Sequence, residues 1–146
     1  DRDCFEGLQY FSPDSTYRIE AKMAKAREPE SIRLETTRGP PMTYDRIGTI
    51  GFSFQDAHRT LTVYRSPGIE EVFLPFRDAT NGETTWRLGR YLNLDVDLES
   101  FDRNATVVAD FNRAYHPFCV YSDDFVSAIP PAENELSVPI RAGERL

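Results

Sequence analysis

Apolar and polar side chains alternate along several short segments of this chain, and this pattern constrains the fold more than any other feature. In residues 17–23 and 92–98 the apolar side chains stand two positions apart, as they do in a β-strand with one buried face. Further segments rich in β-branched and aromatic residues follow, with turn residues between them: 32–37, 43–54, 59–65, 69–76, 106–111 and 136–140. Short strands separated by turns predict a mainly β fold, an antiparallel barrel or sandwich of about eight strands with little helix.

Proline and glycine mark the expected ends of these strands. Residues 27–31 contain Pro29, and we expect them to form a turn between two strands. Asn81-Gly82 is a strong signal for a tight turn, because both residues tolerate a positive φ, so the flanking strands are expected to form a hairpin. Pro139 cannot donate to a sheet ladder, and the segment 136–140 is therefore expected at an edge.

The chain is expected to form a single domain over residues 1–146. Its 146 residues lie within the usual size of one domain, about 100–200 residues, and neither a repeat nor a linker interrupts them. No apolar stretch approaches the roughly 18–20 residues that span a bilayer, so membrane insertion is not expected. The first residues lack the basic-then-apolar order of a signal peptide, and we expect a cytoplasmic protein.

The charge and the metal-binding residue types also narrow the function. With 24 acidic and 17 basic residues the net charge is −7, which repels phosphate backbones and predicts no nucleic-acid binding. Cys4 and Cys119 are far apart and belong to no CxxC pair, so two free thiols are favoured over a zinc site or a disulfide. A metal site can be drawn from His58 and His116 with Asp110 or Glu144, but nothing in the spacing favours it. We therefore expect no metal, and no cofactor is indicated.

The first cluster of polar residues lies in residues 76–92. If Asn81-Gly82 forms a tight turn, then Asp78, Thr80 and Thr85 flank its tip. One interpretation is that these side chains only cap the turn by hydrogen-bonding its amides. The other is that they belong to a functional loop.

Two arginines in the same segment suggest a binding function. Arg87 and Arg90 stand next to Trp86 and Tyr91, and a pair of guanidiniums beside a ring can hold a carboxylate or phosphate that also stacks. Residues three apart in a strand point to opposite faces. The two arginines therefore act together only if Gly89 marks a bulge; otherwise they are solvated.

The second cluster lies in residues 110–122, where an acid, an amide, an imidazole and a thiol occur close together. Asp110 at the end of a strand would orient His116, and the imidazole would serve as a base for Cys119 or for water. The alternative is that Asp110 and Asn112 satisfy loop amides, while His116 packs and Cys119 is a small buried hydrophobe. No nucleophile elbow accompanies these residues.

Three blocks of residues stand in order along nearly the whole chain. The opening block is 5–11 with Asp14 and 17–18; the central block is 76–80, 82–85 and 89–92; the closing block contains 110–115, Pro117, Cys119, Tyr121, 130–131, 133–134, Leu136 and 142–144. These blocks resemble the domain-of-unknown-function family 1684 of bacteria and archaea. That family has no established activity, so the resemblance implies no mechanism.

Three positions depart from the family pattern. Trp86 stands for a usual Tyr, His116 stands where the family usually has Asn, and Ser127 stands where it usually has a second cysteine. The resemblance therefore argues against a mechanism that demands His116, and against a disulfide or metal joining Cys119 to residue 127. It implies these better candidates for a shared site: Asp78, Thr80, Arg90, Asp110, Asn112, Tyr115 and Asn134.

The leading functional hypothesis is a β domain that binds a small anionic molecule at one end of the scaffold. Arg90 would hold the charge and Tyr115 would stack on the ligand. The ligand-binding candidates are Asp78, Thr80, Thr85, Arg87, Arg90, Tyr91, Arg113, Tyr115 and Asn134.

Two alternatives from other classes stand beside it. A hydrolase or lyase would use Asp110 as a base, with Asn112 and Arg113 or Arg90 stabilising negative charge and Cys119 as a further catalytic candidate. A protein-interaction module would instead recruit a partner through the Pro-rich closing segment and the edge strand containing Pro139. The sequence indicates no particular oligomeric state.

Overall fold

Short and long β-strands build the protein, and no α-helix is found in residues 7–99 and 105–146, which are those that this computed structural model describes. The strands are β1 (Gln9–Tyr10), β2 (Arg18–Leu34), β3 (Met42–Phe54), β4 (Ala57–Arg65), β5 (Val72–Phe76), β6 (Arg90–Leu94), β7 (Ala105–Asp110) and β8 (Glu144–Arg145). The single-turn 3-10 helices in these same described residues are η2 (Ser15–Tyr17), η3 (Phe111–Arg113), η4 (Phe118–Val120) and η5 (Ala132–Asn134).

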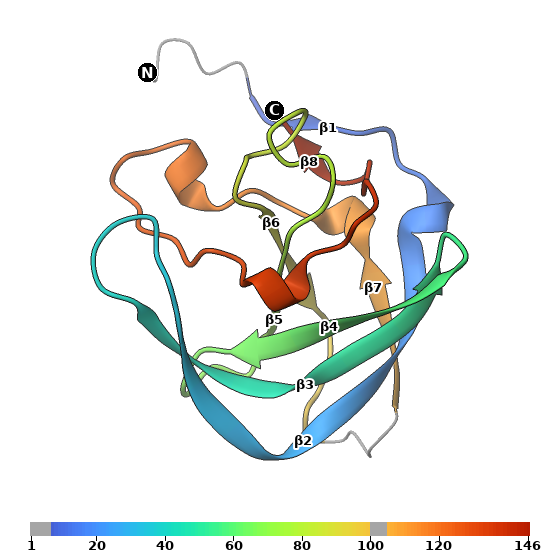
Figure 1. Cartoon of the computed structure of the whole chain (residues 1–146), viewed down its shortest axis with the longest axis vertical. Coiled ribbons are helices and arrows are strands. Elements are labelled where there is room, and N and C mark those ends of the chain that lie inside the picture. Colours follow the sequence, from blue (N-terminus) through green and yellow to red (C-terminus); the bar gives the residue numbers. More distant parts are fainter. Residues whose placement is uncertain (1–6, 100–104) are drawn as a thin grey trace.

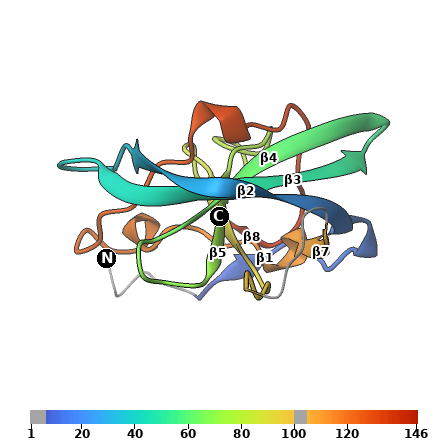
Figure 2. The ribbon, with the colours of Figure 1, turned by 90° about the horizontal axis from the view of Figure 1, so that it is seen from below.

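Six strands form one antiparallel sheet in the order β6-β5-β4-β3-β2-β7. The sheet curls into a half-barrel, and β1 and β8 pair as a separate two-stranded sheet near the chain ends (Figure 1). Figure 2 shows β2, β3 and β4 crossing one side of the molecule, with β1, β7 and β8 on the other. The predicted mainly β, antiparallel fold with little helix is confirmed.

The alternation in the sequence decides which faces are buried. In β2, Ile19, Ala21 and Met23 are buried while the residues between them are exposed. In β3, Ile50 and Phe52 are buried in the same core. Apolar side chains from β2 to β7 meet inside the curled sheet, because each strand removes one apolar face from water.

Two expectations about proline were wrong. Residues 27–31 do not form a turn, because β2 runs through Pro29 to Leu34, and its register with β3 shifts between Lys25 and Glu30. The proline is tolerated there because the ladder is irregular at that point. Residues 136–140 are not an edge strand; Leu136 and Ile140 are buried in the core, and the segment lies beside residues 77–79, to which its backbone is hydrogen-bonded.

The predicted hairpin exists, but its connection is long. β5 and β6 pair from Val72↔Leu94 to Phe76↔Arg90, and residues 77–89 join them. Gly82 has φ +85° in a turn within this loop. The loop ends at Gly89, with φ +119°, where a Cβ would stand 2.5 Å from the carbonyl oxygen of Phe76; only glycine brings the chain this close to β5.

In the described part of the chain, no helix is long and apolar enough to cross a membrane.

Candidate functional site

The loop between β5 and β6 is held by a network around the carboxylate of Asp78. Its Oδ2 accepts hydrogen bonds from the amide and hydroxyl of Thr80, at 3.2 and 2.7 Å, and from the amide of Ile140 at 2.7 Å. Thr80 contacts Thr85 through their hydroxyls at 3.0 Å, and Asn81 donates to both Asp78 and Thr85. Asp78, Thr80 and Thr85 are all buried. Because Asp78 also accepts from Ile140, this network joins the loop to the C-terminal segment.

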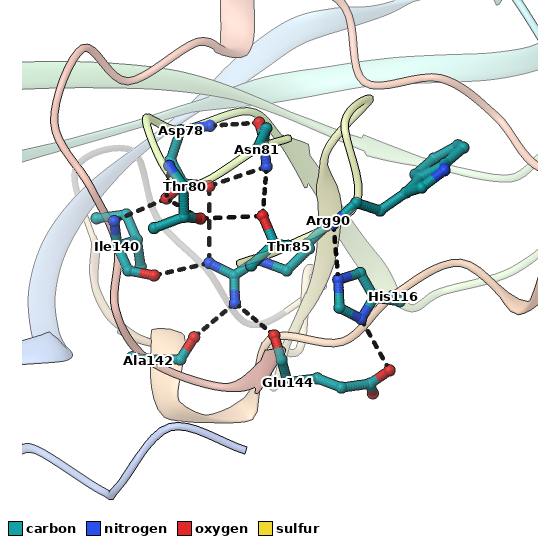
Figure 3. A network of polar contacts seen from close by, with 10 residues as sticks. Asp78, Thr80, Asn81, Thr85, Arg90, His116, Ile140, Ala142 and Glu144 are labelled. Atoms are coloured by element: carbon teal, nitrogen blue, oxygen red, sulfur yellow. Dashed lines mark hydrogen bonds and ion pairs between the residues drawn. The ribbon is translucent and has the colours of Figure 1, made fainter. Parts of the chain in front are cut away.

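Arg90 lies at the centre of the same network and is 0% exposed (Figure 3). Its guanidinium donates to the carbonyl oxygens of Ala142 and Glu144, at 2.6 and 2.9 Å, and of Ile140 at 2.8 Å. Asp78 lies 3.7 Å away, and burial lowers the pKa of Arg90 against the opposing effect of the Asp78 and Glu144 charges. Both terminal nitrogens of this arginine donate to the protein's own backbone, and Nε is buried without a hydrogen-bond partner, so none of its donors faces a surface where a ligand would arrive.

His116 belongs to a second buried contact chain. Its Nε2 accepts from the amide of Trp86 at 3.1 Å, and its Nδ1 lies 3.0 Å from a carboxylate oxygen of Glu144. An imidazole that accepts at Nε2 carries its proton on Nδ1 and donates it to Glu144. Burial raises the pKa of Glu144, but hydrogen bonds from His116 and Tyr121 outweigh it, and the net shift is downward. The acid that orients His116 is therefore Glu144.

Asp110 and Asn112 form hydrogen bonds, here called the clip, that hold the N-terminal segment against the end of β7. Asp110 caps η3 by accepting from the amide and side chain of Asn112, at 3.1 and 2.9 Å. The side-chain amide of Asn112 accepts from the backbone N–H of Asp14 at 3.0 Å and donates to its carbonyl oxygen at 2.9 Å. Asp110 also lines a groove of about 430 Å³ between β6 and β7, together with Arg18 and Arg113.

Asn134 is fully buried and bridges two strands. Its side chain accepts from the amide of Thr62 at 2.8 Å and donates to the carbonyl oxygens of Thr62 and Pro75, at 2.8 Å each. β4 and β5 pair at one position only, Tyr64↔Phe73, so this amide supplies hydrogen bonds that the ladder lacks.

A cavity of about 280 Å³, here called the aromatic pocket, lies on the outer face of β5 and β6. Six rings line it, and four of them form a row in which neighbouring ring centroids are 5.6 Å (Tyr44 to Phe73), 4.7 Å (Phe73 to Tyr91) and 5.7 Å (Tyr91 to Tyr115) apart. The other lining residues are Met42, Ser66, Ile69, Glu71, Asn93, Phe118, Phe125, Val126, Ser127 and Ala128.

Strand alternation and one bridge position these rings. Phe73 and Tyr91 occupy the strand positions next to buried core residues, so they point away from the core. Tyr115 reaches them because its backbone pairs with Tyr91 through two hydrogen bonds, at 2.8 and 2.9 Å. Burial raises the pKa of Tyr44, Tyr91 and Tyr115, so all three hydroxyls are neutral at physiological pH.

Three apolar side chains form an exposed rim around the aromatic pocket. Ile69 is 54% exposed, Phe118 64% and Phe125 49%. Large apolar side chains left in water beside a cavity are typical of a binding surface.

The remaining candidates lie in a third groove. Arg87 and Cys119 line it together with Arg38 and Trp86, and Cys119 is a free, half-buried cysteine. Cys4 lies outside the described residues. No group of three or more potential metal-ligating side chains is found in residues 7–99 and 105–146.

The sequence-predicted residues thus separate into five groups. Tyr91 and Tyr115 meet in the aromatic pocket, Asp110 and Arg113 in the groove between β6 and β7, and Arg87 and Cys119 in the third groove. Asp78, Thr80, Thr85, Arg90 and Asn134 are internal, and Asn112 holds the N-terminal segment.

Tyr44, Phe73 and Glu71 were not predicted as site residues but line the aromatic pocket. A usable signal existed for Phe73. It lies between Val72 and Leu74 in an apolar run. Since neighbouring side chains of a strand point to opposite faces, Phe73 had to point away from the core if Val72 and Leu74 pointed into it. Its ring then had to be covered by other residues.

Comparisons with known proteins agree with this fold. A family model described as "Protein of unknown function (DUF1684)" matches residues 3–145. Among solved structures, the solution NMR structure of an uncharacterised protein from Haloarcula marismortui is 39% identical to this chain, with a TM-score of 0.81, and the match covers 99% of this chain and 79% of that one. A search of curated proteins found no match.

Proposed function

This chain belongs to the DUF1684 family, and we propose that it is a small-molecule-binding domain whose ligand occupies the aromatic pocket. The family is of unknown function, so the proposal is based on the surface that the fold presents. The observation that carries this proposal is the set of four rings, Tyr44, Phe73, Tyr91 and Tyr115, around a cavity of about 280 Å³ outside the core. A ligand that covers these rings removes apolar surface from water, and each Å² buried in this way contributes about 25 cal/mol of favourable binding free energy.

The shape of the pocket supports a small ligand. Ligand sites are concave and mostly apolar, with a few polar groups that set orientation. Here the rings supply the apolar walls, while Ser66, Asn93 and Glu71 supply the polar groups. The anionic ligand expected from the sequence is not favoured at this site, because Arg90 is buried and does not line the pocket.

A fragment screen by NMR tests the proposal. Fragments are expected to shift the backbone amide signals of Tyr91, Asn93 and Tyr115, because these residues line the aromatic pocket. Ser66→Trp is expected to abolish the shifts by filling the pocket, whereas Ser31→Trp, on an exposed position of β2, is expected to leave them intact. Fragments that bind both variants equally, or a screen without shifts at these residues, would refute the proposal.

One observation favours a second candidate function, an enzyme. Asp110 lines the groove between β6 and β7 with Asp95, Arg18 and Arg113, and a carboxylate beside guanidiniums suits a general base with stabilisation of negative charge. A hydrolase or lyase of this kind is expected to turn over ester or anionic model substrates. Asp110→Asn is expected to abolish turnover while keeping the oxygen that caps η3, and a wild-type protein inactive across such a panel would reject this function.

A further inference from the structure

The charges around the aromatic pocket indicate which ligands it suits. Glu71 is the one charged residue among the described residues that line it, and no lysine, arginine or histidine is among them. The whole chain carries a net charge of −7, so the surrounding field has the same sign as Glu71. An anion entering this pocket meets a carboxylate and no cationic side chain; a cation meets the opposite charge.

The aromatic rings add to this preference. The face of a tyrosine or phenylalanine ring carries a negative quadrupole potential that attracts cations, and a set of rings is the usual receptor for ammonium groups bearing methyl substituents. Six rings line the pocket, and successive pairs among four of them, Tyr44, Phe73, Tyr91 and Tyr115, lie within 4.7–5.7 Å of one another. One ligand group can therefore contact more than one ring.

The hydroxyl groups of the three tyrosines are already engaged and are therefore not free to donate to an anion. Tyr115 donates to Oδ1 of Asn93 at 3.1 Å, Tyr91 donates to the carbonyl oxygen of Ala128, and Tyr44 contacts Sδ of Met42 at 4.0 Å. Each hydroxyl proton is directed at a group of the protein. The negative charge of Glu71 also reaches the hydroxyl of Tyr115, where it adds to burial in raising that pKa.

We propose that the ligand of the aromatic pocket is a small organic cation, an ammonium group bearing methyl or other alkyl substituents, held by the four rings and Glu71. This inference rests on the proposed small-molecule function of the same pocket. The cavity of about 280 Å³ lies at the lower end of ligand-site volumes, which suits a compact cation and not a drug-sized molecule.

The test compares three probes of one shape. Choline, its carbon isostere 3,3-dimethyl-1-butanol and the anion 3,3-dimethylbutyrate are titrated into the full chain while the amide signals of Tyr91, Asn93 and Tyr115 are followed by NMR. Choline is expected to bind at least about tenfold more tightly than the neutral isostere, because partly desolvated cation–π contacts and a nearby carboxylate act on the charge alone.

Two matched glutamate variants identify the charge that acts. Glu71→Gln is expected to weaken choline binding by about fivefold without changing the affinity for the neutral isostere. Glu70→Gln, the exposed neighbour that does not line the pocket, is expected to change neither. Phe73→Leu, which keeps an apolar side chain but removes a ring, is expected to weaken choline more than the isostere.

The outcomes separate this inference from the proposal on which it rests. If the neutral isostere or the anion binds as tightly as choline, or if Glu71→Gln leaves choline affinity unchanged, the pocket binds small molecules but the cation inference is wrong. If none of the three probes shifts the pocket signals and the fragment screen also finds no ligand there, the proposed function fails together with this inference.

Discussion

Replacing Arg90 with methionine is expected to destabilise the fold severely. The guanidinium donates to the carbonyl oxygens of Ile140, Ala142 and Glu144 and lies beside the buried carboxylate of Asp78. Methionine fills a similar length but donates nothing. Three buried acceptors then lose their donor, and one buried carboxylate loses its neighbouring cation.

The size of the effect follows from those lost partners. Each buried polar group left unsatisfied costs about 1–3 kcal/mol, and removing one partner of a buried ion pair costs about 3–5 kcal/mol. Asp78 keeps its hydrogen bonds from Thr80 and Ile140, so we expect the bottom of both ranges for the three carbonyl groups and the ion pair, a loss of about 6 kcal/mol. That is a large share of the roughly 5–15 kcal/mol that stabilises an ordinary domain.

Urea unfolding followed by the fluorescence of Trp86, the single tryptophan of the chain, measures this loss. Arg87→Met is the matched control, because Arg87 is exposed and its replacement is expected to change the free energy of unfolding by no more than about 0.5 kcal/mol. Arg90→Lys keeps the charge but not the planar set of donors, so it is expected to fall between the two.

A small effect would refute the reasoning. If Arg90→Met costs less than about 1 kcal/mol and also removes ligand-induced stabilisation, Arg90 acts on a ligand and the structural account of it is wrong. If the variant is unstable but still binds pocket ligands when folded, its function is to hold the C-terminal segment.

Three further predictions concern the internal contacts. Hydrogen bonds lower the folded pKa of Glu144 below its ordinary value of 4.5. The contribution of Glu144 to stability is therefore complete above that value and is lost as the pH falls through the folded pKa. Urea unfolding at several acidic pH values is expected to show this loss of stability, and Glu144→Gln is expected to make the loss smaller. Asn134→Ala is expected to lower the free energy of unfolding by about 2–4 kcal/mol in the same assay, because the amide and carbonyl of Thr62 lose their partner; a loss below about 1 kcal/mol would contradict the bridging role. Asn112→Ala is expected to cost about 1 kcal/mol and to speed hydrogen exchange at the amide of Asp14, and unchanged exchange there would show that the clip is dispensable.

Much of the fold could be predicted from the sequence because strand alternation is a local property. The buried faces of β2 and β3 follow from residues such as Ile19, Met23 and Ile50, whose neighbours in sequence are polar or small. The predicted ends of strands were less accurate. Pro29 lies inside β2, because a register shift with a neighbouring strand accommodates it, and that partner is not visible in the local sequence.

The candidate site was predicted only in part, because polar residues that cluster in sequence serve two different purposes. Arg90 and Tyr91 are neighbours in β6, yet Arg90 points to the buried network and Tyr91 points to the aromatic pocket. Composition alone cannot separate them, since either residue type can bind a ligand or support a fold.

Antiparallel strands with alternating faces follow from the sequence alone, because the period of two is present in consecutive residues. The role of Asp78 and Arg90 in holding segment 140–144 is visible only in the three-dimensional structure, since their partners lie 50 or more residues away. The tertiary structure also brings Tyr44, Phe73 and Tyr115 together from three separate parts of the chain. A pocket forms where residues remote in sequence come close together, and their separation depends on how the sheet curls and on which segments cover it.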